Sequence, residues 1–215
     1  MYAGAMTTEP SSIQRQTDTT SRERILKAAL YLLAINGFLA TTTRAIAAEA
    51  KVNQTTLFRH FRGKRELYVA AVDDVADEYH YSEKLCSAMS SCDPKDPSSI
   101  GALIHFTCQI CREIPDFCRV LCNSIVEPGF ADPTSASTDV RHKYLLPIRE
   151  FIRTFCTYSA TEGKLQGDPN SHAEALFAMI FWKLHTDTFR QQTKMGQEES
   201  LSAQSIMKLW LSGCV

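Results

Sequence analysis

The sequence predicts an all-α protein with a small N-terminal helical module joined to a larger helical domain. Apolar residues recur at intervals of three and four through most of the chain, and no segment alternates like a strand. Breakers such as "SSCDPKDPSS" and "EGKLQGDPN" separate the helical segments. With 215 residues, 44% of them hydrophobic and 22% charged, the chain is long enough to bury a sizeable core.

The N-terminal segment changes character near residue 20. Residues 1–19 are rich in Ser, Thr, Gln and Pro, so we expect a disordered arm there. Thr20 and Glu23 then have the spacing of a capping box, and an apolar face leads to a stop at Gly37. The residues of that face are Ile25, Ala28, Ala29, Leu32 and Leu33. This segment is the first predicted helix.

Two short helices are expected next. Thr42 or Thr43 can cap the first, and Asn53 can cap the second. Their predicted inward residues are Ile46, Ala47 and Ala50, then Leu57 and Phe61. Two helices joined by about three residues make a helix-turn-helix, whose second helix enters the DNA major groove. We therefore predict a DNA-binding domain over residues 20–68 and a larger helical domain over 69–215.

The charge distribution agrees with this division. Nine basic and three acidic residues lie between Ser21 and Tyr68, although the whole chain has a formal net charge of -1. The remainder is therefore acidic. A basic module attached to an acidic domain suggests that the module contacts a polyanion.

The exposed side of the predicted recognition helix is rich in DNA-reading groups, namely Gln54, Thr55, Thr56, Phe58, Arg59 and His60. Glutamine can bond the adenine edge, arginine the guanine edge, and threonine can contact thymine or a phosphate. Lys64 follows at the start of the next helix, where its charge favours a phosphate. A merely solvated helix face would need no such arrangement.

Residues from about Thr20 to Val72 closely resemble the DNA-binding domain of the TetR family of bacterial transcriptional regulators. The shared pattern is Ile25-Leu26, Ala28-Ala29, Gly37-Phe38, Thr42-Thr43-Arg44, Ile46-Ala47, Val52, Thr56-Leu57-Phe58, Phe61 and Lys64. The resemblance implies that Thr42 and Lys64 contact phosphates and that His60 touches the backbone or a base. It also implies base readout by Arg44, Gln54 and Thr56.

Two positions depart from the family pattern. Lys51 stands where the family usually has a turn glycine, and a positive φ there would cost a lysine about 1 kcal/mol. Phe58 stands where tyrosine often bonds a phosphate, so packing against the sugar-phosphate edge is expected instead. Neither departure threatens the fold.

The larger domain should contain six further helices, according to the breakers and the apolar periodicity. Their expected ranges are 64–89, 99–113, 115 to just before 127, 138–161, 171–192 and 199–211. The last two carry more apolar surface than one narrow stripe, and part of it is explained by the protomer's own core. In proteins resembling this one, these helices form a dimer, which pairs two recognition helices with successive half-sites. Expected interface residues are Leu176, Met179, Ile180, Lys183, Leu184, Ile206, Leu209 and Trp210.

The resemblance further implies a small effector bound in the larger domain. Candidate pocket residues are Phe106, Phe130, Tyr144, Phe151, Phe155, Trp182 and His185, a composition that favours a largely apolar or aromatic ligand. The expected protein is then a repressor released from a palindromic operator by this unidentified effector. A DNA-binding protein that needs no ligand is an alternative.

A cysteine-rich stretch supports a different alternative. His105, Cys108, Cys111, Cys118 and Cys122 fall within 18 positions, the first three at helical spacing. They could make the regulator respond to a metal or an oxidant. Cysteine is also among the residues most often buried as a small apolar group, and we expect that role here.

Other functional classes have little support. The chain shows no phosphate-binding glycine loop, nucleophile elbow or HExxH pattern, so we expect neither an enzyme nor a bound cofactor or metal. No apolar run reaches the roughly 18 residues that span a bilayer, and the N-terminus lacks the pattern of an export signal. A cytoplasmic protein with reduced thiols and no membrane partner is expected.

Overall fold

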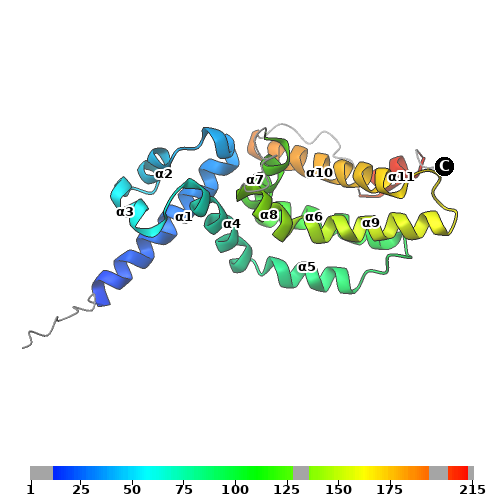
Figure 1. The fold of residues 1–215 in the computed structure, drawn as a ribbon, viewed down its shortest axis with the longest axis horizontal. Helices are drawn as coiled ribbons and strands as arrows, with labels where there is room; N and C mark the ends of the chain where they lie inside the picture. The colour runs from blue at the N-terminus through cyan, green and yellow to red at the C-terminus, as the bar shows by residue number, and fades with distance from the viewer. Residues whose placement is uncertain (1–11, 128–135, 194–202, 213–215) are drawn as a thin grey trace, which may run out of the picture.

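The computed structural model describes residues 12–127, 136–193 and 203–212. Every regular element in those ranges is an α-helix, which confirms the predicted fold class. The molecule is elongated, with α2 and α3 near one end and α9 to α11 toward the other (Figure 1). No helix in the described ranges is long and apolar enough to cross a membrane.

Helix α1 runs from Ser12 to Ala40 and has a non-helical residue at Gly37, with φ 75° and ψ 176°. The stop predicted at this glycine is therefore present as a kink. The start differs from the prediction, because residues 12–19 are helical and not a disordered arm. No proline or glycine stands between Pro10 and Gly37 to end a helix, so the capping pair at Thr20 lies inside it. Residues 1–11 lie outside the described part.

The predicted helix-turn-helix is present as α2, Thr43–Glu49, and α3, Gln54–His60. The Thr42 hydroxyl accepts a hydrogen bond from the Ala45 amide at 3.1 Å, and Asn53 Oδ1 accepts one from the Thr56 amide at 2.7 Å. Both caps are those that the sequence indicates. The predicted inward residues are buried, namely Ile46, Ala47, Ala50, Leu57 and Phe61.

The prediction of one continuous helix over residues 64–89 is wrong. The chain forms α4, Lys64–Glu78, and α5, Tyr81–Ser90, separated at His80, which has the left-handed values φ 55° and ψ 40°. The break brings the ring of Tyr81 to 5.2 Å from that of Phe117, and the Tyr81 hydroxyl donates to the Tyr144 carbonyl at 2.9 Å. Burying and bonding this tyrosine offsets a left-handed residue, which costs about 1 to 2 kcal/mol.

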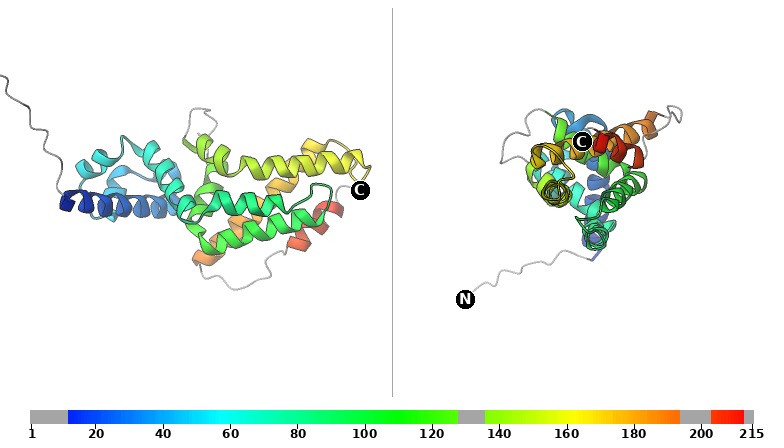
Figure 2. Two further views of the ribbon diagram at one scale, coloured as in Figure 1. Left: turned by 90° about the horizontal axis from the view of Figure 1, so that it is seen from below. Right: turned by 90° about the vertical axis from the view of Figure 1, so that its right-hand side faces the viewer.

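The remaining helices build the larger domain. They are α6, Ser98–Glu113; α7, Pro115–Val126; α8, Ala136–Tyr144; α9, Leu146–Thr161; α10, Pro169–Thr193; and α11, Ala203–Ser212. The expected single helix over 138–161 is interrupted at Leu145, because Pro147 cannot continue an existing helix. Helices α6 and α9 run roughly along the long axis of the molecule, and α10 crosses it obliquely (Figure 2, left).

The two parts of the molecule share helices and core. Helix α4 starts in the helix-turn-helix module and continues into the larger domain, so the boundary expected at residue 68 lies inside it. Helix α1 packs against α4 on one side and α7 on the other.

Candidate DNA-binding interface and its connection to the larger domain

Helix α3 presents a polar face to solvent. Leu57 is fully buried beneath it, while Gln54, Thr55 and Arg59 are exposed and Phe58 is 49% exposed. The four-residue spacing of Leu57 and Phe61 fixes the helix on its module and leaves the polar residues outside. These exposed groups have the chemistry for reading base edges.

The other predicted contact residues have mixed surroundings. Arg44, on the first turn of α2, is exposed, and Thr43 is half-buried. Thr42 is exposed, although its hydroxyl already caps α2. Thr56 and His60 are half-buried, and the His60 ring lies 6.3 Å from the ring of Phe61. The side chains that DNA can reach are therefore mainly Arg44 and those on the exposed face of α3.

The turn before α3 contains a left-handed residue, a conformation that favours glycine. Lys51 has φ 55°, one of two positive values among the described non-glycine residues. The Lys51 amide donates to the Ala48 carbonyl at 3.1 Å, and the Val52 amide donates to that of Ala47 at 2.9 Å. Lys51 therefore adopts a strained left-handed conformation in this turn.

Lys64 lies in a cage of backbone carbonyls. Its Nζ donates to the carbonyl oxygens of Phe38 at 2.6 Å and Thr41 at 2.9 Å, and it lies 4.3 Å from the centre of the Phe38 ring. Burial lowers the pKa of Lys64 from its ordinary value, against the field of Glu127. The sequence predicts a phosphate contact for this ammonium, whereas its contacts here hold the connection between α1 and α2.

A carboxylate from the larger domain caps the same connection. The Phe38 amide donates to both oxygens of Glu127, at 2.8 and 3.1 Å, across 89 positions of sequence. A Cβ at Gly37 would lie 1.7 Å from Glu127 Oε1, so the positive φ and the missing side chain are both required. One turn earlier in α7, Asn123 Nδ2 donates to the Ala34 carbonyl at 3.2 Å.

These contacts form the interdomain joint, defined as Gly37, Phe38, Lys64, Asn123 and Glu127. Sequence reasoning does not find Asn123 or Glu127. Their four-residue spacing places both on one side of α7, but nothing in the sequence identifies the backbone groups that they meet.

The aromatic residues predicted to bind an effector are not brought to one pocket. Tyr144 is buried in a cluster with Tyr81 and Phe117, and the Phe155 ring lies 5.9 Å from that of Trp210. Phe151 is buried and Phe106 is half-buried. Trp182 is 70% exposed and stacks on His185. Phe130 lies outside the described residues.

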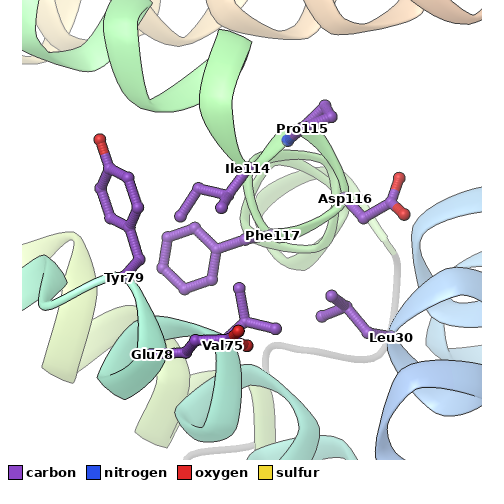
Figure 3. Close-up of a pocket in the computed structure, with 8 residues that line it drawn as sticks. All are labelled: Leu30, Val75, Glu78, Tyr79, Ile114, Pro115, Asp116 and Phe117. Atoms are coloured by element: carbon purple, nitrogen blue, oxygen red, sulfur yellow. The ribbon is translucent and has the colours of Figure 1, made fainter.

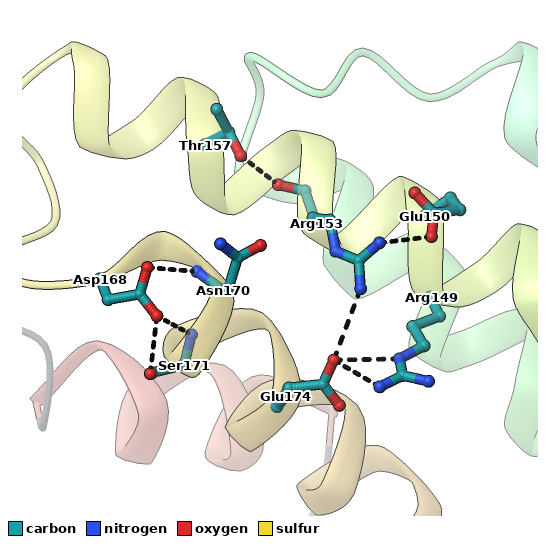
Figure 4. A network of polar contacts seen from close by, with 8 residues as sticks. All are labelled: Arg149, Glu150, Arg153, Thr157, Asp168, Asn170, Ser171 and Glu174. Carbon is teal, nitrogen blue, oxygen red and sulfur yellow. Dashed lines mark hydrogen bonds and ion pairs between the residues drawn. The ribbon is translucent and has the colours of Figure 1, made fainter.

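A different set of residues forms the large-domain pocket, about 470 Å³ in volume. Its lining is Ile125, Arg141, His142, Leu145, Leu146, Arg149, Glu174, Phe177, Ala178 and Phe181. Arg149 Nε and Nη2 donate to Glu174 Oε1 at 3.0 and 2.6 Å, joining α9 to α10 (Figure 4). By contrast, a void lined by Phe117, Cys118 and their neighbours inside the domain measures only about 20 Å³, about the size of one water.

The residues predicted to form a dimer interface divide into two groups. Leu176, Ile180, Lys183, Leu184, Ile206 and Trp210 are buried in the protomer's own core. Met179 is half-buried, and Leu209 is 51% exposed. On the outward side of α10, Ala175 and Ala178 are exposed together with Trp182. Among the described side chains of the last two helices, the outward apolar surface is thus narrower than the sequence pattern suggests.

The cysteine-rich stretch is packed as core. Cys111, Cys118 and Cys122 are buried, whereas His105 is exposed, so the histidine does not join the thiols. Burial raises the pKa of the Cys118 and Cys122 thiols well above the ordinary range. No three His, Cys, Asp or Glu side chains of the described part gather in a way that could hold a metal. Protonated, enclosed thiols do not favour a metal or redox response.

Three features together define a DNA-binding regulator. They are an exposed recognition helix, a basic module around it, and a capping contact from a second helical domain. A profile of the family described as "Bacterial regulatory proteins, tetR family" matches residues 25–71. This match confirms the predicted resemblance. Residues 25–71 therefore carry the DNA-binding domain of this family, and solved structures that share the fold of the chain include TetR family transcription regulators.

Individual relatives agree with the assignment. The uncharacterized HTH-type transcriptional regulator YvkB of Bacillus subtilis (strain 168) is 24% identical over 164 residues, 75% of this chain and 79% of that protein. The HTH-type transcriptional repressor Rv3405c of Mycobacterium tuberculosis is 39% identical over 94 residues, 42% of this chain and 47% of that protein. The structure of AibR in complex with isovaleryl coenzyme A and operator DNA has a TM-score of 0.62 at 16% identity, covering 90% of this chain and 97% of that one.

Proposed function

We propose that the protein is a repressor that binds a palindromic operator as a homodimer and leaves it when a small, largely apolar effector occupies the large-domain pocket. The observation that carries this proposal is the position of Ile125. It lines the pocket from the last turn of α7, two residues before Glu127, which caps α1. A ligand in the pocket therefore contacts the turn that holds the DNA-binding module.

The pocket lining indicates the chemistry of the effector. Six lining residues are apolar, and the polar ones are the Arg149–Glu174 ion pair and the basic side chains Arg141 and His142. A mainly apolar molecule that carries a carboxylate or another hydrogen-bond acceptor fits this surface.

The coupling is reciprocal. If the effector favours a position of α7 in which the two recognition helices no longer match successive grooves, DNA must weaken effector binding by the same factor. In this scheme the joint transmits the movement, because the Phe38 amide is bonded to α7 and the Phe38 carbonyl to Lys64.

For the homodimer, the outward side of α10 and α11 is the proposed contact. Trp182 and Leu209 supply its exposed apolar groups, flanked by the small residues Ala175 and Ala178. A single helix-turn-helix makes few base contacts, so a two-fold pair is the simplest route to specificity. Sedimentation should give a dimer for the parent and for Tyr31→Ser, which removes an exposed aromatic from α1, but a weakened dimer for Trp182→Ser.

The first test of DNA binding is selection of duplexes from a random pool by the purified protein. The parent should enrich a palindrome, and Arg44→Ala or Gln54→Ala should relax preference at defined positions in each half-site. Failure of the folded protein to enrich any sequence at low salt would contradict the assignment of α3 as a reading helix.

The second test addresses the coupling. Small apolar acids that raise the thermal stability of the protein are assayed for release of the selected operator. Glu127→Gln should still bind such an acid but release the operator less, because a neutral amide holds the Phe38 amide more weakly. Glu162→Gln, an exposed carboxylate after α9, is the matched control. Full release by Glu127→Gln would refute transmission through the joint.

A further inference from the structure

A second pocket lies where the DNA-binding module meets the larger domain (Figure 3). This hinge pocket is lined by Leu30 of α1, by Val75, Glu78 and Tyr79 at the end of α4, and by Ile114 with the first three residues of α7, 115–117. Its volume is about 380 Å³, within the range of small-molecule sites. It shares no residue with the large-domain pocket or with the predicted DNA contacts, so it is a separate site.

The walls of the hinge pocket are mainly apolar. Phe117 is fully buried and Leu30 is buried on the opposite side; Val75 lies below the Phe117 ring and Ile114 above it (Figure 3). The Tyr79 ring forms one side of the pocket. The body of a small aromatic or alkyl molecule could therefore lose water against these side chains.

The charged groups of the pocket are carboxylates. Glu78 is exposed and forms no salt bridge within the described part of the chain, while Asp116 pairs with Arg119 at 2.6 Å. No basic side chain lines the pocket. Glu78 would attract a cation and repel an anion, whereas the charge of Asp116 is balanced by Arg119.

The Tyr79 ring already accepts an ammonium group from within the protein. Lys84 Nζ lies 3.4 Å from the centre of this ring, a cation-π contact. Because this ammonium already occupies the ring, Tyr79 serves the pocket as an apolar wall, and Glu78 is the group that attracts a cation.

We propose that the hinge pocket binds a small apolar organic cation, an aryl- or alkylammonium, with its hydrocarbon body against Leu30, Val75 and Phe117 and its charge near Glu78. Because such an occupant touches α1 and the last turn of α4 together, it holds the DNA-binding module at one angle to the larger domain. That turn ends immediately before His80, the left-handed residue that breaks the helix. The site acts independently of the effector and repressor roles proposed above.

The test uses the full chain without DNA and three probes: benzyltrimethylammonium, its uncharged isostere neopentylbenzene, and phenylacetate. Calorimetry should show saturable binding of the cation and none of phenylacetate. Glu78→Gln should weaken binding of the cation by about threefold to fivefold, the range of an exposed ion pair, and leave binding of neopentylbenzene unchanged. Asp77→Asn removes the neighbouring exposed carboxylate, which does not line the pocket, and should leave both affinities unchanged.

A steric variant locates the site. Val75→Phe fills the pocket and should abolish binding of the cation and of neopentylbenzene, with circular dichroism confirming that the helices are intact. Retained binding in a folded Val75→Phe protein would overturn the proposal. It would equally be overturned by equal losses in Glu78→Gln and Asp77→Asn, or by absence of cation binding to the parent. Since no operator or acidic effector enters these measurements, their failure is distinct from failure of the proposed repressor function.

Discussion

Helices α3 and α7 are both short, and both carry polar side chains, but those side chains act in different ways. In α3, Gln54, Thr55 and Arg59 face solvent, where a partner from outside can meet them. Asn123 of α7 and Glu127, the residue that follows the helix, bond backbone groups of α1 that lie about 90 positions earlier in the chain. The chemistry of α3 therefore resides in its own residues, whereas the role of the α7 side chains depends on distant backbone.

The largest effect is expected where α7 meets α1. Gly37→Ala forces a left-handed alanine and drives its Cβ into Glu127, so the charged hydrogen bond to Phe38 is lost. Together these changes should lower the free energy of unfolding by about 3 kcal/mol. Denaturant titration measures the loss.

A glycine in the larger domain provides the control for that substitution. Gly101 lies in α6, and a Cβ there meets nothing within 4 Å. Gly101→Ala should raise the free energy of unfolding by up to about 1 kcal/mol, as alanine does in a helix. If Gly37→Ala were as harmless, the joint would contribute little to holding the two domains together.

For α3 the expected effect is on binding and not on folding. Gln54→Ala removes an exposed side chain from the recognition helix, so stability should change little. The free energy of binding to the selected operator should weaken by about 1 to 3 kcal/mol, and the sequence preference should relax. Competition binding with variant operators measures both effects. An equal loss on every DNA sequence would reassign Gln54 to the phosphate backbone.

A substitution of Lys64 tests whether this residue stabilises the interdomain joint or contacts DNA phosphate. Because its ammonium donates to the carbonyls of Phe38 and Thr41, Lys64→Ala should lower the free energy of unfolding by about 1.5 kcal/mol. The slope of log affinity against log salt should stay unchanged, whereas loss of a phosphate contact would flatten it by about one unit. Arg65→Ala, next to it and exposed, is the control for charge alone.

The DNA-binding module could be predicted from sequence because its determinants are local. Thr42 and Asn53 cap helices within three residues of themselves, and Leu57 and Phe61 are paired by one helical turn. A residue type at a fixed spacing was enough to place each of these elements.

The larger domain was predicted only as a set of helices, because its pockets depend on contacts between distant segments. Phe155 is as aromatic as Phe177, yet the first packs on Trp210 and the second lines the large-domain pocket. Apolar character predicts burial but does not specify the neighbour. The break at His80 was not predicted for the same reason. It depends on the packing of Tyr81 against Phe117 and Tyr144, which are distant in sequence.

The smallest expected effects concern the two left-handed residues, Lys51 and His80, both with φ 55°. Glycine adopts this conformation without steric cost but loses more chain entropy on folding, so Lys51→Gly should raise the free energy of unfolding by only about 0.5 to 1 kcal/mol. His80→Gly should produce a similar gain if the break between α4 and α5 is a fixed feature of the folded chain.

Should His80→Gly instead destabilise the protein while Lys51→Gly stabilises it, the two left-handed positions would have different structural roles. The turn before α3 would be a rigid local motif, and the break at His80 would be a flexible hinge that the histidine side chain helps to limit. Chemical denaturation of both variants in parallel makes the distinction, and protection of the α4 amides from hydrogen exchange shows where any added freedom lies.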